Sequence, residues 1–203
     1  MKKINKITAI LILGLVLLAS CDSFLEEEPR GLLQTNNFYN NDREAVLASN
    51  GLYRVLQRGS LYRTRGLDNY YVNGADLVGP SRNVNGNIHN YLIDEGVSDG
   101  NGTWGALYEI VRNANDIIAR VESNENLSEA IRNQVLGEAY FMRALAYFHL
   151  TNLWGDVPYF RELLPIQELS VLTRTPKSTI TTDMKTDLII VCVLCNNFSS
   201  IFS

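Results

Sequence analysis

Residues 137–158 read GEAYFMRALAYFHLTNLWGDVP and form the densest apolar stretch beyond the first twenty residues. Alanines alternate with large side chains, so a neighbouring helix can approach closely while the aromatic rings fill the space between helices. A helix that is apolar on nearly every side is stable in water only when other helices bury it. The segment is therefore predicted to be the central helix of an all-α domain, and Gly155 and Pro158 are predicted to end it.

Two helices are predicted upstream of this segment. Asn41 and Glu44 have the spacing of a capping box, and apolar residues recur at helical intervals from there to about residue 57. A second helical pattern covers about 103–123 and places Trp104 on its apolar stripe. Trp104 is therefore interpreted as a core residue rather than a ligand platform.

The central helix is expected over about 128–153, after a second pair with capping-box spacing, Asn126 and Glu129. Its charged residues Glu138 and Arg143 would be buried, and buried charges need polar partners. Those partners are expected on the preceding helix: Arg112, Asn113 or Asn115.

The C-terminal end changes character. Residues 177–187 are predicted to begin another helix, whereas residues 189–203 form an anomalous hydrophobic tail that suggests a frameshift or premature stop. Cys192 and Cys195 have no second cysteine pair for a zinc site and no βαβ context for a redox site. His149 lies on the apolar stripe of the central helix and is interpreted as a packing residue. The sequence therefore predicts no metal and no cofactor.

Residues 1–20 are typical of a lipoprotein signal peptide. Lysines precede an apolar run of about 13 residues, too short to span a bilayer, and small residues lead to Cys21. Cys21 is the predicted lipidation site, and acyl chains there would tether the protein to a membrane. The alternatives are an ordinary secretory signal that ends near a cysteine, or an uncleaved anchor. Residues 21–40, with the acidic run 26–28, are predicted to be a tether and lead-in.

Residues 60–102 are rich in glycine and asparagine and show no sustained period, so a long loop is predicted there, in which Leu67–Val72 could form a helical turn or two. Its tyrosines are interspersed with polar residues, a combination suited to sugars, because a flat ring stacks on a pyranose while polar groups bond its hydroxyls. The alternative is that the tyrosines pack the loop onto the helices. The candidate ligand contacts are Tyr70, Tyr71, Asn73, Asp76, Arg82 and Tyr91.

Charge and composition exclude other classes of function. The net charge is −4, and losing three N-terminal lysines with the leader would make it −7. Binding to a phosphate backbone needs a basic face, so a nucleic-acid partner is not expected. No pair of carboxylates and no nucleophile with a base stands out, so the chain is not expected to be an enzyme.

Several short motifs, taken together in their order and spacing, resemble the N-terminal region of the SusD/RagB family of outer-membrane nutrient-binding lipoproteins. The resemblance extends from the leader to about Leu188. The motifs are CDSFL at 21–25, ASNGLY at 48–53, WGALY at 104–108, RNAN at 112–115, GEAYFMRA at 137–144 and WGDVP at 154–158.

The resemblance implies a tetratricopeptide-like helical fold over residues 41–188, here incomplete because family members are much longer. It also implies a lipid-anchored protein at the outer membrane, facing the cell exterior, that captures a glycan or other nutrient. Its implied partner is a SusC-like TonB-dependent transporter. The alternative is a membrane-anchored tetratricopeptide-like module that binds other proteins. Helical repeats without a terminal cap expose an apolar face, so a truncated chain is expected to aggregate or to bind hydrophobic dyes.

Overall fold

The structure is a computed structural model that describes residues 38–62, 66–72 and 98–199. The described residues all belong to one compact unit, residues 38–203. The predicted signal peptide, the lipidation site Cys21 and the tether up to residue 37 lie outside the described residues.

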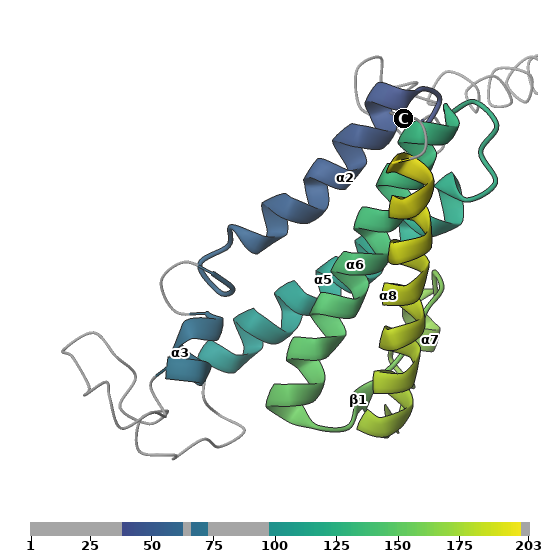
Figure 1. The fold of residues 1–203 in the computed structure, drawn as a ribbon. Helices are drawn as coiled ribbons and strands as arrows, with labels where there is room; N and C mark the ends of the chain where they lie inside the picture. The colour runs from purple at the N-terminus through teal and green to yellow at the C-terminus, as the bar shows by residue number, and fades with distance from the viewer. Residues whose placement is uncertain (1–37, 63–65, 73–97, 200–203) are drawn as a thin grey trace, which may run out of the picture. The chain divides into compact units, whose positions relative to one another are not determined.

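The described part of the chain is mostly helical, as the sequence predicts (Figure 1). A two-stranded antiparallel ribbon, with Val157 opposite Thr175, joins the last long helices. The elements are α2 (Asp42–Leu56), α3 (Leu67–Val72), α5 (Ser98–Val121), α6 (Glu129–Trp154), β1 (Val157–Pro158), α7 (Ile166–Leu169), β2 (Arg174–Thr175) and α8 (Lys177–Ser199).

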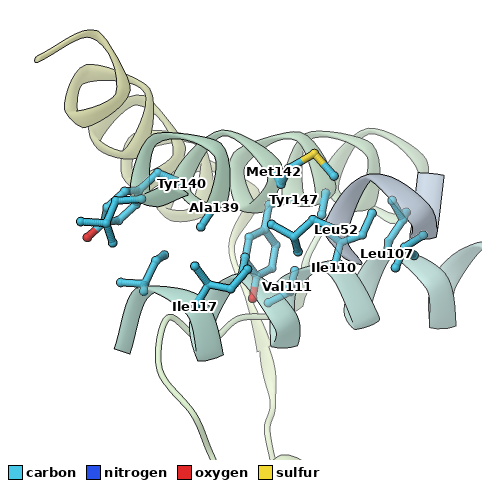
Figure 2. Packing of buried hydrophobic residues seen from close by; sticks show 14 of the residues in the cluster. Leu52, Leu107, Ile110, Val111, Ile117, Ala139, Tyr140, Met142 and Tyr147 are labelled. Carbon is cyan, nitrogen blue, oxygen red and sulfur yellow. The ribbon is translucent and has the colours of Figure 1, made fainter. Parts of the chain in front are cut away.

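Helix α6 is the centre of the packing, and it contacts α2, α5 and α8 (Figure 1). Figure 2 shows side chains of α2, α5 and α6 meeting in one apolar layer. Burying a leucine or isoleucine side chain contributes roughly 1.5–3 kcal/mol, so this layer is the main source of stability. The labelled residues of the layer are Leu52, Leu107, Ile110, Val111, Ile117, Ala139, Tyr140, Met142 and Tyr147.

The start of α2 confirms the predicted cap. The side chain of Asn41 accepts a hydrogen bond from the Glu44 N–H at 3.1 Å. The Glu44 carboxylate accepts in return from the N–H of Asn40, at 2.8 Å, one residue earlier than in a standard capping box. The N–H of Glu44, in the first turn of α2, is therefore bonded by the cap, and the N–H of Asn40 just before the helix is bonded as well.

The predicted capping pair at the start of α6 is wrong. The N-cap is Ser128, and its side chain makes no cap hydrogen bond. Instead, its N–H and hydroxyl both donate to the carboxylate of Asp42, at 2.8 and 2.7 Å. A contact between residues 86 apart replaces the local pair, which ties the starts of α2 and α6 together.

The end of α6 confirms the role predicted for Gly155. Its φ of +73° is the conformation that favours glycine, and its N–H donates to the Thr151 carbonyl at 3.1 Å. Its ψ of −118° lies outside the left-handed helical region, so the chain leaves the helix directly into the short strand β1.

The start of helix α5 differs from the sequence-based prediction. Helix α5 begins at Ser98, five residues before the predicted start, although its first turn contains Gly100. A tertiary contact supports this end of the helix, because the Thr103 hydroxyl donates to the Ser60 carbonyl at 2.7 Å. Tertiary contacts can outweigh the roughly 1 kcal/mol that glycine costs in a helix.

Helix α8 is continuous across residue 188, where the composition changes. Val191 and Leu194, beyond that point, pack against the core. The predicted domain boundary between residues 188 and 189 thus stays a prediction. A single helix can continue through a point where the composition of the sequence changes, so its continuity does not test the boundary. None of the helices in the described ranges has both the length and the apolar composition needed to cross a bilayer.

Glu138 and Arg143, the charged residues in the middle of α6, are paired in different ways. Arg143 donates to Asn115 of α5 at 2.7 Å, as predicted, and also makes a two-pronged ion pair with Asp187 of α8, both bonds at 2.8 Å. Glu138 instead accepts from Ser49 of α2 and from Gln134, at 3.0 Å for the latter. The expectation that Glu138 bonds to α5 is therefore wrong.

Candidate ligand-binding site

The C-terminal end of α6 carries a cluster of rings that we call the aromatic end: Tyr62, Tyr70, Tyr71, His149 and Trp154. Helix α3 supplies Tyr70 and Tyr71, the turn after α2 supplies Tyr62, and α6 supplies the other two. The Tyr70 and Trp154 rings lie 6.1 Å apart, centre to centre. The short helix α3 is thus held on α6 through aromatic contacts, beside the start of α5 (Figure 1).

His149 is the polar centre of the aromatic end. Its Nε2 is 2.8 Å from the Tyr62 hydroxyl, and its Nδ1 is 3.1 Å from the Tyr71 hydroxyl. A neutral imidazole has one donor and one acceptor, so one tyrosine donates to the ring and the other accepts from it. Burial lowers the pKa of His149 below its ordinary 6.5, which favours this neutral form. The predicted packing role of His149 is confirmed.

The two tyrosines that bracket His149 remain half exposed. Tyr62 is 44% and Tyr71 is 46% exposed, although both hydroxyls are engaged. Partial burial, with a smaller contribution from nearby Tyr62, raises the pKa of Tyr71, so its hydroxyl stays protonated at neutral pH. Each side chain is therefore held at its hydroxyl while nearly half of its surface is exposed, which leaves area for stacking on a flat ligand surface.

The aromatic contacts continue along α5. Trp104 meets Trp154 edge-on, with centroids 5.1 Å apart, and meets Tyr108 at 4.9 Å. Tyr108 is stacked on Phe160, at 6.0 Å and 12° between planes. Trp104 packs against the core while staying partly exposed, so the predicted core role is confirmed and one side of its ring remains accessible.

The structure places only two of the six predicted ligand contacts. Tyr70 and Tyr71 lie together at the aromatic end, where both touch α6. They pack α3 onto the helices, in line with the alternative interpretation, but Tyr71 keeps an open ring face. The remaining candidates lie outside the described residues and stay predictions: Asn73, Asp76, Arg82 and Tyr91.

Sequence reasoning missed the link between Tyr62 and His149. These residues are 87 positions apart, and neither lies in a recognisable motif. The available signal was the polar His149 on an otherwise apolar stripe, because a buried imidazole needs two hydrogen-bonding partners.

The described residues contain no group of three or more His, Cys, Asp or Glu side chains that could hold a metal ion. Cys192 and Cys195 are exposed free thiols on α8. The arrangement at the aromatic end is thus one of rings and hydroxyls, which suits binding of an uncharged or weakly charged organic ligand.

Solved structures show the class of fold. The crystal structure of a SusD homologue from Bacteroides thetaiotaomicron superposes with a TM-score of 0.65 and 22% identity, covering 83% of this chain and 33% of that one. A laminarin-binding SusD-like protein also gives 0.65 and 22%, covering 77% and 34%. The described helices thus have the tetratricopeptide-like fold of SusD proteins.

Sequence comparisons show the family. SusD-like protein P25 of Formosa agariphila is 39% identical over 178 residues, which is 83% of this chain and 34% of that protein. A SusD-like protein of Bacteroides ovatus is 30% identical over 165 residues, which is 75% and 28%. The family model SusD-like, described as starch-binding associating with outer membrane, matches residues 23–187.

The chain therefore belongs to the SusD-like family. It spans about a third of the length of the curated relatives it matches. The family's description is of binding rather than catalysis, and of association with the outer membrane.

Proposed function

We propose that this chain takes part in the capture of a glycan at the cell surface, with the aromatic end contributing to the binding site. In this proposal Cys21 carries the lipid that anchors the protein to the outer membrane, facing outward. The ligand passes to a SusC-like TonB-dependent transporter. The observation that carries the proposal is the pair Tyr62 and Tyr71, fixed by His149 yet half exposed.

Fixing the hydroxyls of these tyrosines favours binding on physical grounds. A flexible side chain loses conformational entropy when a ligand immobilises it, at about 0.5–1.5 kcal/mol each. Tyr62 and Tyr71 are already held by His149, so less entropy remains to be lost. Their open ring faces can then stack on the apolar side of a pyranose.

The comparisons support a glycan ligand in general terms. The family description names starch, and one neighbour of the same fold is a laminarin-binding protein. Both statements concern those proteins, and their ligands differ from one another. Support for a sugar ligand in this chain therefore comes from the family together with the exposed rings, and the identity of the sugar is left to experiment.

A second candidate function is a protein-interaction module. Phe141 and Phe148 lie seven residues apart on α6 and are 44% and 50% exposed. Phe141 also lines a hollow of about 480 Å³ between α6 and α8, together with Tyr53 and Leu194. Helical-repeat proteins commonly bind partners through such faces. Co-purification with proteins other than a transporter would favour this function.

Calorimetry with starch- and laminarin-derived oligosaccharides tests the glycan proposal. Tyr62→Ala and Tyr71→Ala are each expected to weaken binding by about tenfold, the effect of losing one stacked ring. Tyr53→Ala is the matched control, because Tyr53 is 41% exposed but lies on α2 away from the aromatic end. Binding that survives both substitutions, or that falls equally with the control, would refute the aromatic end as a glycan site.

The anchor is tested separately in cells. Cys21→Ser is expected to abolish incorporation of labelled fatty acid and to release the protein from the membrane fraction. Ser20→Thr keeps the cysteine and serves as the control. Labelling that persists in Cys21→Ser would contradict lipidation at this position.

A further inference from the structure

A hollow of about 440 Å³ lies on the outer side of α5, between this helix, the chain after β1 and the turn around α7. Tyr70 and Tyr71, the two predicted ligand contacts among the described residues, are not part of its lining. Its main lining residues are Trp104, Tyr108, Arg112, Phe160, Leu169 and Leu172.

The aromatic wall of this hollow is rigidly held. The Tyr108 hydroxyl donates to the Pro158 carbonyl at 2.6 Å, and its ring is stacked on Phe160. Burial, and to a lesser extent nearby Tyr147, raises the pKa of Tyr108, so the hydroxyl remains a donor at any ordinary pH. Gly105 adds space, because a Cβ built there would meet nothing within 4 Å.

The charge at the edge of the hollow is positive. Arg112 is exposed, and no hydrogen bond or ion pair joins it to another of the described residues. Glu109, the acidic residue of the lining, is engaged by Arg58 at 2.7 Å. The guanidinium of Arg112 is therefore available to an anionic group placed beside the aromatic wall, and its planar fork matches a carboxylate.

Ring contacts link the hollow to the aromatic end. Trp104 lines the hollow and also contacts Trp154, which in turn contacts Tyr70. A series of contacting rings therefore runs from α3 to the α5 wall of the hollow.

We propose that this hollow is a second sugar subsite that takes a carboxylate-bearing sugar, with Arg112 binding the carboxylate and the ring of Trp104 or Tyr108 packing against the sugar face. This inference rests on the proposed glycan-binding function and extends it to uronic-acid-containing oligosaccharides. It assigns to Arg112 a selective role that the neutral rings of the aromatic end cannot have.

The test compares tetragalacturonate with its fully methyl-esterified form, which has the same length and linkages but no carboxylate charge. At about 0.15 M salt, where distant charges are screened, the acid form is expected to bind about tenfold more tightly. Arg112→Gln is expected to remove this difference. Arg54→Gln is the matched control, because Arg54 is an exposed arginine on α2.

Tryptophan fluorescence shows whether tetragalacturonate binds beside Trp104. The chain has two tryptophans, Trp104 and Trp154, so Trp154→Phe leaves Trp104 as the single reporter. Tetragalacturonate is expected to change the Trp104 emission in this variant, and Arg112→Gln is expected to abolish the change. Circular dichroism of each variant confirms that it is folded.

Three outcomes would overturn the subsite: no binding of tetragalacturonate, equal binding of acid and ester, or an unchanged preference in Arg112→Gln. Equal losses in Arg112→Gln and Arg54→Gln would likewise overturn it, as a general effect of charge. These failures differ from failure of the proposed function. Neutral oligosaccharides that bind through Tyr62 and Tyr71 would uphold that function even where Arg112 has no effect.

Discussion

Arg143, in the middle of α6, is 2% exposed, whereas Tyr62 and Tyr71, which contact the end of the same helix, are 44% and 46% exposed. Around Arg143 the polar groups bond to one another inside the protein: Asp187 accepts from both Arg143 and Arg161, and Asn115 bridges α5 to the chain after β1. We call this cluster the polar junction: Asn115, Arg143, Arg161 and Asp187. At the aromatic end the hydroxyls of Tyr62 and Tyr71 are bonded to His149, and the two tyrosines remain half exposed.

This difference in burial indicates that the middle of α6 contributes mainly to stability and that its C-terminal end contributes mainly to binding. A buried ion pair is costly to break because the remaining charge loses its partner in a medium of low polarity. Half-exposed rings can be altered at little cost to the fold, because water already covers part of them. Substitutions in the polar junction are therefore expected to affect unfolding, and substitutions at the aromatic end to affect binding.

The largest effect is expected from Asp187→Ala. It leaves the Arg143 guanidinium buried without its counter-charge, which typically costs about 3–5 kcal/mol. Urea unfolding followed by circular dichroism measures the loss. The double variant Arg143→Met/Asp187→Leu removes both charges and is expected to be more stable than the single variant. A single variant within about 1 kcal/mol of the parent would show that the junction is not what holds α8 on α6.

A smaller effect is expected from Tyr147→Phe, between the two regions. The Tyr147 hydroxyl donates to the Phe160 carbonyl at 2.9 Å and accepts from the Phe160 N–H at 3.0 Å. Its removal leaves the Phe160 N–H unsatisfied at a buried position, at a cost of about 1–3 kcal/mol, while the Phe160 carbonyl keeps its longer hydrogen bond from Asn115 at 3.4 Å. The measurement is again the urea midpoint, and Tyr53→Phe, at an exposed tyrosine of α2, is the control. Equal midpoints for the two variants would mean that water replaces the lost hydroxyl.

Helices α2, α5 and α6 could be predicted from local sequence, whereas α3 lies within the stretch 60–102 that was predicted to be a loop. The cap at Asn41, the end of α6 at Gly155 and the contact between Arg143 and Asn115 all follow from spacing along the chain or from adjacent helices. These features need only the period of a helix and the requirement that buried charges be paired. The helical fold of the chain was predictable for the same reason.

The partners that complete each region could not be predicted in the same way. Asp187 reaches Arg143 across 44 residues, and Tyr62 reaches His149 across 87. Such pairs depend on how the helices cross, and no local pattern encodes that. Ser128 shows the same limit, because its partner Asp42 is the first residue of a helix that begins 86 residues earlier.

A still smaller effect on stability is expected from Tyr71→Phe at the aromatic end. The substitution removes the hydroxyl bonded to His149 and keeps the ring, and a hydrogen bond at a half-exposed position contributes about 0.5–1.5 kcal/mol. Glycan affinity should fall less than in Tyr71→Ala, because the stacking face is retained. A loss of stability comparable to that of Asp187→Ala would contradict the separation of the two regions.

The smallest effect is expected from the charge on His149, and its sign follows from burial. The pKa of His149 is lowered in the folded protein, so the unfolded chain binds a proton more readily below about pH 6.5. The contribution of the neutral ring is complete above pH 6.5 and is lost as pH falls through the lower pKa of the folded state. Urea midpoints at about pH 7.5 and about pH 5.5 measure this loss, and His149→Gln should reduce it, because the glutamine amide can still donate and accept but does not titrate. The folded-state pKa of His149 can be measured by NMR, with the His149→Gln spectrum used to assign its signals. A value at or above 6.5 would show that Tyr62 and Tyr71 stabilise the charged ring. It would also show that the aromatic end is more open to water than the burial of the imidazole indicates.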